Sequence, residues 1–195
     1  MNRKTMLVII LLAFGQYNCI TDSTAPAPGP GSRNYIWISD TIPSIDTARR
    51  IWGSSPSDLW VVSFGDLRHT IYHFDGESWS TDGVYRDISP LSIWGFARDE
   101  VYISGQMGEI WHFNGSNWKE FAKLTKDGIK NIAFSHIWGV SSDNFYATGA
   151  YGDDQGLINN SVIAHYYNKQ WNMINTEGLQ GIVSNLYVNK KAHLS

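Results

Sequence analysis

The tripeptides Ile51-Trp52-Gly53, Ile93-Trp94-Gly95 and Ile137-Trp138-Gly139 are three copies of one motif in a chain of 195 residues. Each copy opens a block of similar sequence, and the blocks follow one another at a period of about 40 residues. Internal repetition at this period is typical of a fold in which each block forms one supersecondary unit. The sequence therefore predicts a repeat protein.

Further positions recur at fixed spacing inside each block. A second aromatic residue follows each motif Trp by eight positions, two residues after an acidic or amide residue, and a His later precedes another Trp by six positions. The aromatic residues are Trp60, Tyr102 and Tyr146, the acidic or amide residues are Asp58, Glu100 and Asn144, the histidines are His73, His112 and His165, and the closing tryptophans are Trp79, Trp118 and Trp171.

Each block is predicted to form four short antiparallel strands. Apolar residues in residues 58–63 and 70–74 alternate or run continuously, which indicates strands and not helices. Asp75-Gly76 and Asn114-Gly115 are predicted to form two-residue type I′ turns between the third and fourth strands. Asn168-Lys169 stands at the same place in the third block and is a weaker match, compatible with a left-handed Asn.

Four strands in about 40 residues, repeated in tandem, are typical of a β-propeller blade and not of a sandwich or barrel. We expect an all-β fold with three blades, at residues 47–81, 89–121 and 132–174, the last carrying an insertion at 150–160. The Gly after each motif Trp suits a crowded inner strand, and the motif tryptophans would pack between blades.

The Ile-Trp-Gly, Asp-Leu-Trp and His-Phe-Asp-Gly-x-x-Trp series resembles the repeats of bacterial secreted β-propellers, which are related in style to kelch and Asp-box blades. The likeness covers roughly residues 33–188. Residues 34–39 resemble an isolated outer strand that would close a ring, and residues 181–188 could begin a fourth blade. Three blades and two strands make an incomplete ring. It is explained by a truncated product, which we favour, by closure through self-association, or by an open stack.

The N-terminus predicts export. Basic residues precede an apolar run at 6–14 that has the length of a signal-peptide core, so residues 1–19 are interpreted as a signal peptide. Cys19, the only cysteine, resembles the lipid-modified cysteine of bacterial lipoproteins, which implies a membrane anchor; the alternative is an ordinary secretory peptide. Residues 20–32 read as a flexible Pro/Gly/Ser tether, and 189–195 as a tail.

Charge and motif content argue against several classes of function. A net charge of -3 argues against nucleic acid as a partner, and no cofactor motif occurs. The three repeated histidines lie too far apart in successive blades for a metal ring, so we expect them to bond neighbouring loops. Asp58, Glu100 and Asn144 are expected to organise turns through bonds to the backbone. Asp153 and Asp154 could hold calcium, although a solvated loop is the favoured interpretation.

The leading functional hypothesis is an exported, non-catalytic module that presents loops to a protein or glycan at the cell envelope, with Tyr85 and Tyr151 as contact residues. The alternative is a fragment of an exported carbohydrate-active enzyme, acting through carboxylates such as Glu109 or Asp153. No catalytic residue, metal site or cofactor is assigned, and the specific ligand cannot be derived from the fold.

Overall fold

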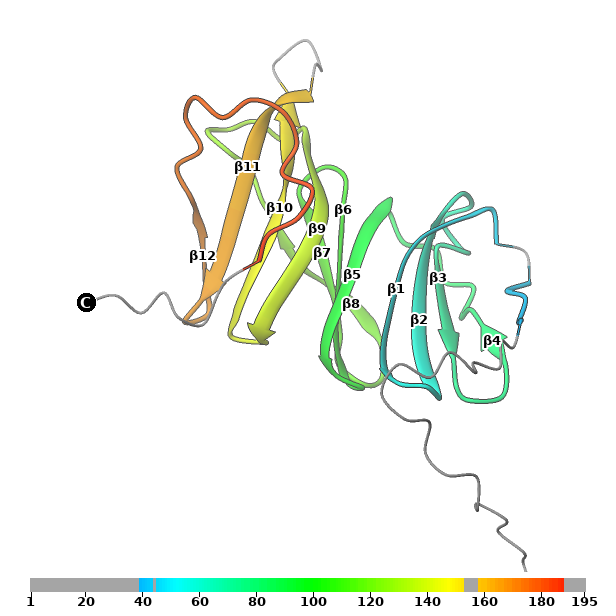
Figure 1. Cartoon of the computed structure of the whole chain (residues 1–195). Coiled ribbons are helices and arrows are strands. Elements are labelled where there is room, and N and C mark those ends of the chain that lie inside the picture. Colours follow the sequence, from blue (N-terminus) through cyan, green and yellow to red (C-terminus); the bar gives the residue numbers. More distant parts are fainter. Residues whose placement is uncertain (1–38, 44, 153–157, 188–195) are drawn as a thin grey trace, which may run out of the picture. The chain divides into compact units, whose positions relative to one another are not determined.

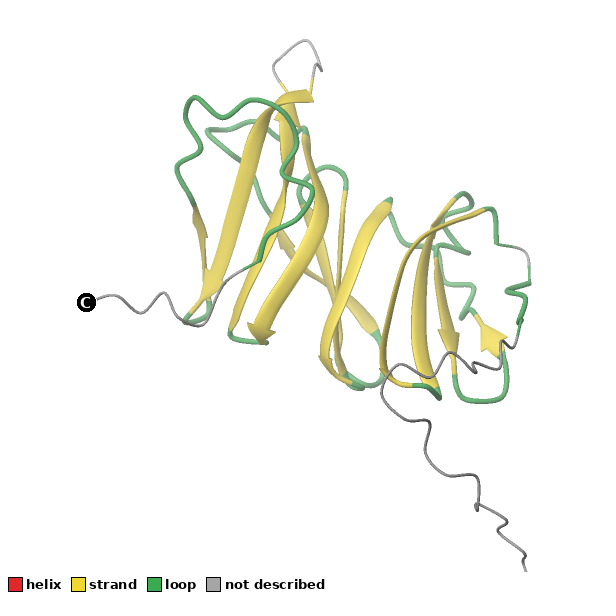
Figure 2. Cartoon of the chain, in the orientation of Figure 1, coloured by secondary structure: helices red, strands yellow, loops and turns green. Residues whose placement is uncertain are grey.

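A computed structural model of the chain describes residues 39–43, 45–152 and 158–187, and the chain divides between Ser39 and Asp40. The described residues form strands and connecting loops without a helix (Figures 1 and 2). Within that part of the chain there is accordingly no helix that could span a membrane.

In the described part of the chain, twelve strands form three separate four-stranded sheets, each antiparallel and ordered as in the sequence. The first sheet contains β1 (Thr47–Ser55), β2 (Asp58–Phe64), β3 (Ile71–Phe74) and β4 (Trp79–Ser80). The second contains β5 (Pro90–Ala97), β6 (Glu100–Gly105), β7 (Glu109–Phe113) and β8 (Trp118–Lys123). The third contains β9 (Ile132–Ser141), β10 (Asn144–Gly152), β11 (Ile158–Tyr167) and β12 (Gln170–Met173). The predicted all-β fold with three blade-like sheets is confirmed.

The repeated residues form one row across each sheet. In the first sheet Trp52 lies opposite Trp60, which lies opposite His73. The same register places Trp94, Tyr102 and His112 in the second sheet, and Trp138, Tyr146 and His165 in the third. The closing Trp residues, Trp79, Trp118 and Trp171, pair with the aromatic residue that follows each His, namely Phe74, Phe113 and Tyr166. The fixed spacing in the sequence therefore reflects cross-strand pairing.

The motif tryptophan of the first sheet packs against the second sheet. The ring of Trp52 lies directly on Gly95 of the second sheet, where an added Cβ would approach the indole to 2.5 Å. Gly53 and Gly139 are crowded for a different reason, because an added Cβ there would meet Leu59 and Phe145 on the next strand of the same sheet. The motif Gly thus admits close packing in all three copies, but only Gly95 does so demonstrably across a junction.

The predicted two-residue turns are wrong at two of three places. Gly76 and Gly115 have positive φ, but Asp75 and Asn114 do not, and four residues separate the strands. The side chain of Asp75 instead accepts hydrogen bonds from the backbone N–H groups of Glu77 and Ser78, both at 2.9 Å, and Asn114 caps its own loop in the same way. Asn168 and Lys169, the weakest match, both have positive φ and form the tight turn.

The segment after β12 returns across the third sheet and occupies the place of a further first strand. Thr148 donates a hydrogen bond to the carbonyl oxygen of Val183 at 3.0 Å, just as Ser104 donates to that of Phe134 at 3.0 Å. Val183 precedes Tyr187 by four residues, as Phe134 precedes Trp138. The rings of Trp138 and Tyr187 are 5.7 Å apart, close to the 6.2 Å between Trp94 and Trp138. Residues 183–187, which form no strand, therefore lie beside the third sheet, within the segment 181–188 that could begin a fourth blade.

Several predictions concern residues outside the described part of the chain. These are the signal peptide at 1–19 with Cys19, the tether at 20–32, all but the last residue of the closing strand at 34–39, the acidic pair at 153–154 and the tail at 189–195.

Candidate functional site

The repeated histidines bond the repeated acidic or amide residues of their own sheets. His73 Nε2 lies 2.7 Å from Asp58 Oδ1, and His165 Nε2 lies 2.9 Å from Asn144 Oδ1. Asp58 also accepts a short hydrogen bond from Ser54. The expectations that the histidines bond neighbouring loops, and that the acidic residues bond the backbone, are therefore wrong for these two pairs. Both residue types lie on the same face of adjacent strands, so their side chains meet each other first.

The second sheet carries a variant of this arrangement. His112 Nε2 lies 3.1 Å from Glu100 Oε1 but without the alignment of a hydrogen bond, and the same carboxylate accepts a hydrogen bond from the Tyr102 hydroxyl at 2.7 Å. Burial, and then the neighbouring Glu100, raise the pKa of Tyr102, so the phenol stays protonated.

In all three sheets the His ring stacks on the row aromatic. Ring centroids are 4.1 Å apart for Trp60 and His73, 4.4 Å for Tyr102 and His112, and 4.0 Å for Tyr146 and His165. A pair of a carboxylate and a His could serve catalysis. Here the position beside the His recurs in every sheet, and in the third sheet it is Asn144, which has no carboxylate. A structural role for the row explains this recurrence. No cluster of three His, Cys, Asp or Glu residues suited to a metal occurs in the described part.

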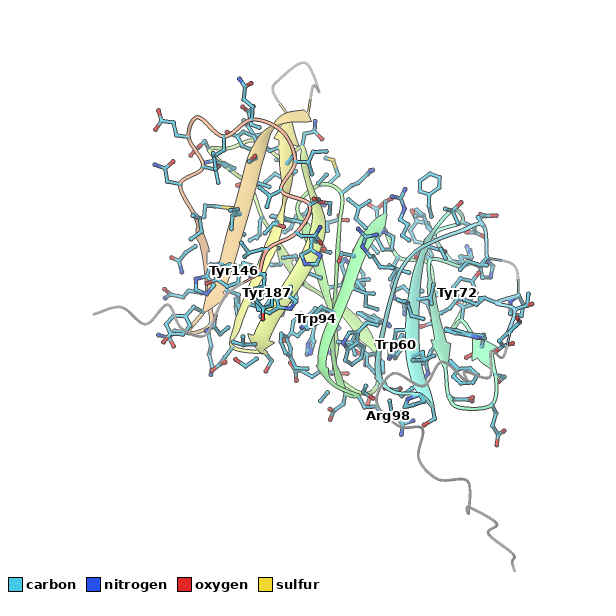
Figure 3. All side chains as sticks on the ribbon, in the orientation of Figure 1. Trp60, Tyr72, Trp94, Arg98, Tyr146 and Tyr187 are labelled. Carbon is cyan, nitrogen blue, oxygen red and sulfur yellow. The ribbon has the colours of Figure 1, made fainter. Side chains whose placement is uncertain are left out.

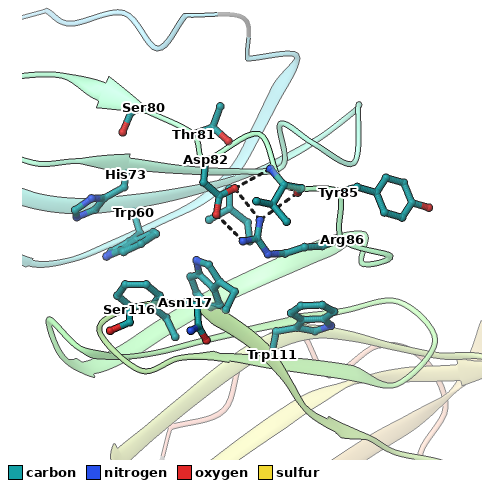
Figure 4. A pocket seen from close by; sticks show the side chains of 14 residues that line it. Trp60, His73, Ser80, Thr81, Asp82, Tyr85, Arg86, Trp111, Ser116 and Asn117 are labelled. Atoms are coloured by element: carbon teal, nitrogen blue, oxygen red, sulfur yellow. Dashed lines mark hydrogen bonds and ion pairs between the residues drawn. The ribbon is translucent and has the colours of Figure 1, made fainter.

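A hollow lies between the first and second sheets. It has a volume of about 620 Å³ and is lined by residues of β2 to β4, the loop after β4, β7 and the start of β8. Its lining residues are Trp60, Ile71, His73, Ser80, Thr81, Asp82, Val84, Tyr85, Arg86, Trp111, Phe113, Ser116, Asn117 and Trp118 (Figure 4). We call this hollow the inter-sheet cleft.

The short β4 strand opens this cleft. β4 pairs with β3 at two positions, whereas β8 pairs with β7 at five. Three residues after Trp118 the second sheet has Phe121, which contacts Tyr102 of its own sheet and Tyr166 of the third. Three residues after Trp79 the first sheet has Asp82 instead. The position that is aromatic in the second sheet is therefore polar after the first.

Asp82 and Arg86 form the polar centre of the cleft. Arg86 Nη1 and Nη2 donate to the two carboxylate oxygens of Asp82 at 2.9 and 2.5 Å, and Nη1 also donates to the Val84 carbonyl at 3.2 Å (Figure 4). The Arg86 side chain is only 8% exposed, while that of Asp82 is 49% exposed. The guanidinium holds the pKa of Asp82 below its ordinary value. The pair therefore stays ionised near neutral pH, and its net charge is zero.

Aromatic side chains form much of the remaining wall. Trp60 and Trp118 are buried and stabilise the junction, since Trp60 lies 4.8 Å from Phe113 and 5.4 Å from Trp118 between ring centroids. Trp111 and Phe113 are half-buried and leave part of their rings accessible. The predicted contact residue Tyr85 is 57% exposed, and its ring points away from the Asp82–Arg86 pair (Figure 4). The cleft thus offers rings, hydroxyls and an amide to a ligand.

A smaller hollow of about 160 Å³ adjoins the same junction and shares Trp60, His73 and Phe113 with the cleft. Asp58, Arg98 and Asp99 also line it. Arg98, which is labelled in Figure 3, has a side chain that is 72% exposed, and its Nε lies 3.7 Å from Asp58 Oδ1. The repeated acid of the first sheet therefore has a cationic neighbour on the second sheet.

Of the other predicted contact and catalytic residues, Glu109 and Tyr151 are not part of the cleft lining, and Asp153 lies outside the described residues. Glu109 is 5% exposed, its carboxylate lies 2.7 Å from Lys123 Nζ, and burial raises its pKa although Lys123 opposes that change. Tyr151 is half-buried, with Lys126 Nζ 5.7 Å from its ring centroid. Sequence analysis missed Asp82 and Trp111. Comparison of Asp82 with Phe121 across repeats was the signal that could have located the cleft.

No family model matches the chain, and no curated protein matches it. A solved structure described as "YCF48 bound to D1 peptide" is similar, with a TM-score of 0.52 and 16% sequence identity. The similarity covers 72% of this chain and 43% of that one, so the chain spans less than half of the other protein's length. The match and the three four-stranded sheets define a propeller-type fold.

Proposed function

We propose that the chain is a non-catalytic binding module and that the inter-sheet cleft receives an extended segment of a partner protein. The observation that carries this proposal is the break in the repeat at Asp82, which leaves an open hollow in a junction that the neighbouring repeat fills with aromatic rings. Aromatic side chains with partial exposure beside paired charges are typical of surfaces that bind other proteins.

The chemistry of the cleft favours a peptide with apolar side chains. Trp111 and Phe113 supply ring faces for such side chains, while Ser80, Thr81 and Asn117 supply hydrogen-bonding groups for a peptide backbone. The solved structure of similar fold is described as holding a peptide, which supports the same class of ligand by analogy of fold alone. A glycan is the other ligand that rings and hydroxyls could bind, and the experiment separates the two.

The test uses the full chain against a random peptide library displayed on phage and an array of bacterial surface oligosaccharides. The decisive variant is Asp82→Phe combined with Arg86→Met, which gives the first sheet the residue type that fills the second junction and removes the buried cation. We expect peptides enriched on the wild type to bind this variant at least about tenfold more weakly. Enrichment of oligosaccharides alone, or equal binding to both proteins, would overturn the proposal.

The alternative enzyme hypothesis needs two carboxyl groups in one cleft. Among the described residues that line the larger cleft, Asp82 is the only carboxylate, and it is paired with Arg86. Asp58 and Asp99 both line the smaller hollow, so they are the carboxylate pair that we test for a carbohydrate-active site. Release of reducing sugar from cell-wall glycans by the wild type, abolished in Asp99→Asn, would favour the enzyme and count against the module.

We also propose that the module works at the cell envelope, anchored through lipid on Cys19. The apolar run, the single cysteine after it and the Pro/Gly-rich stretch beyond support this proposal. In a bacterial host, metabolic labelling with an alkyne fatty acid should mark the wild type and leave Cys19→Ser unlabelled. Equal labelling of both, or recovery of the wild type in the cytoplasm at its full uncleaved length, would contradict export as a lipoprotein.

A further inference from the structure

The three sheets pack by one rule that leaves complementary faces at the two ends of the row. The Ile of each motif packs toward the preceding sheet: Ile93 is 4% exposed and lies in a cluster with Trp60 and Val62 of the first sheet. Ile137 is 1% exposed and lies in a cluster with Tyr102 and Ile110 of the second. Ile51, at the same position in the first sheet, is 62% exposed.

An apolar groove surrounds Ile51 on that face of the first sheet. It has a volume of about 350 Å³ and is lined by Asp40, Ile42, Ala48, Arg49, Arg50, Ile51, Val61 and Trp79. We call the surface formed by Ile51, Ala48 and Gly53 the leading face. The face at the same position in the second and third sheets is covered by residues of the sheet that precedes it in the chain.

The opposite face of the third sheet is also incompletely covered. In the second sheet Phe96 lies 5.8 Å from Phe145 of the third, between ring centroids, and so fills their junction. Val140 occupies the position of Phe96 in the third sheet and is 52% exposed. Tyr187, at the position of a motif Trp, is 83% exposed although its ring lies 5.7 Å from that of Trp138. We call the surface formed by Val140, Trp138 and Tyr187 the trailing face.

We propose that a second copy of this chain docks head to tail, with its leading face on the trailing face of the first copy. The contact would repeat the internal junctions: Tyr187 of one copy would lie over Gly53 of the other, as Trp52 lies over Gly95 within one chain. The second copy is the favoured occupant because its leading face corresponds to the face that the second and third sheets bury against the sheet before them. Burial of the exposed apolar side chains provides the driving force.

Disulfide trapping tests the orientation of this contact. In the full chain carrying Cys19→Ser, Ile51→Cys and Tyr187→Cys are prepared separately, mixed, and oxidised mildly. Head-to-tail docking predicts that the disulfide between positions 51 and 187, identified by peptide mass spectrometry, exceeds both the 51–51 and the 187–187 products. Statistical proportions of the three products, or an excess of either symmetric one, would overturn the proposal.

Sedimentation velocity tests its strength with a matched control. Ile51→Glu should weaken self-association by at least about tenfold, whereas Val84→Glu, which places the same charge at a side chain of similar exposure on the cleft, should leave it unchanged. A wild-type chain that stays monomeric at about 100 µM, or equal effects of the two variants, would refute the docking. Peptide binding at the cleft should be weakened by Val84→Glu and should be unchanged by Ile51→Glu. The two proposals can therefore fail separately.

Discussion

The two junctions between sheets are built from the same repeat, but one is filled with aromatic rings and the other contains a cleft. Between the second and third sheets, Phe121 contacts a closed set of rings that includes Tyr102, Phe145 and Trp171. Between the first and second sheets, Asp82 replaces the equivalent of Phe121 and the cleft remains. The filled junction and the open junction therefore differ in residue type at this repeat position.

The sharpest test of this contrast is the loss of an aromatic side chain from each junction. Phe145 is fully buried among five rings, and Phe145→Ala should lower the free energy of unfolding by about 4 kcal/mol because it leaves a cavity. Trp111→Ala, in the half-open junction, should cost less than about 2 kcal/mol because the side chain is already partly in water. Urea unfolding followed by fluorescence measures both, and a larger loss at Trp111 would contradict the contrast.

The first junction should still lose stability when a residue is enlarged in its tightly packed part, where Trp52 lies on Gly95. Gly95→Ala places a methyl group against Trp52 and should cost about 2 kcal/mol through overpacking. Combining it with Trp52→Leu, which shortens the opposing side chain, should recover part of that loss in a double-mutant cycle measured by urea unfolding. Strictly additive losses would show that the two residues do not touch.

The polar centre of the cleft makes stability depend on pH. Arg86 lowers the pKa of Asp82 in the folded chain, so its contribution is present above the unfolded-state pKa of about 4 and is lost as the pH falls through the lower folded value. Asp82→Asn should cost about 1 kcal/mol at neutral pH, discounted for solvent screening of the half-exposed carboxylate, and the gap should close in acid. Urea unfolding at a series of pH values measures the difference in free energy of unfolding between the wild type and Asp82→Asn. A difference that does not change with pH would contradict the role of the ion pair. Asp99→Asn, at an exposed position, provides the control.

The smallest expected effect concerns the repeated row. Burial lowers the pKa of His165, which pairs with Asn144, whereas His73 pairs with a carboxylate. Asn144→Asp should raise the pKa of His165 by about one unit, because an adjacent negative charge favours the protonated ring. The added stability, below about 1 kcal/mol, would appear at low pH and vanish as the pH rises through the new value. NMR titration of His165 measures the pKa, and an unchanged value would contradict the pairing.

Repeat spacing predicted most of this fold because the intervals that recur from repeat to repeat reflect the pairing of residues on neighbouring strands. The intervals from Trp52 to Trp60 and from His73 to Trp79 follow from register and hairpin length alone. Turn type was less predictable, since Asp75 uses its side chain to cap a longer loop and so does not adopt the left-handed conformation. Local dipeptide preference was overruled by side-chain capping.

The cleft was harder to predict because it depends on a residue that departs from the repeat. Asp82 carries no catalytic motif, and its partner Arg86 is identifiable only once the loop after β4 is folded. The bond between Asp58 and His73 was also not predicted, because spacing alone does not show that the two side chains lie on the same face of neighbouring strands.

Hydrogen exchange of the full chain, with and without a peptide selected on it, tests the central claim most directly. If the inter-sheet cleft is the binding site, added protection should concentrate in residues 80–88 and 111–118, and Asp82→Phe with Arg86→Met should abolish it. Protection confined to the third sheet or to residues 183–187, and retained in that double variant, would contradict the assignment of the cleft as the binding site.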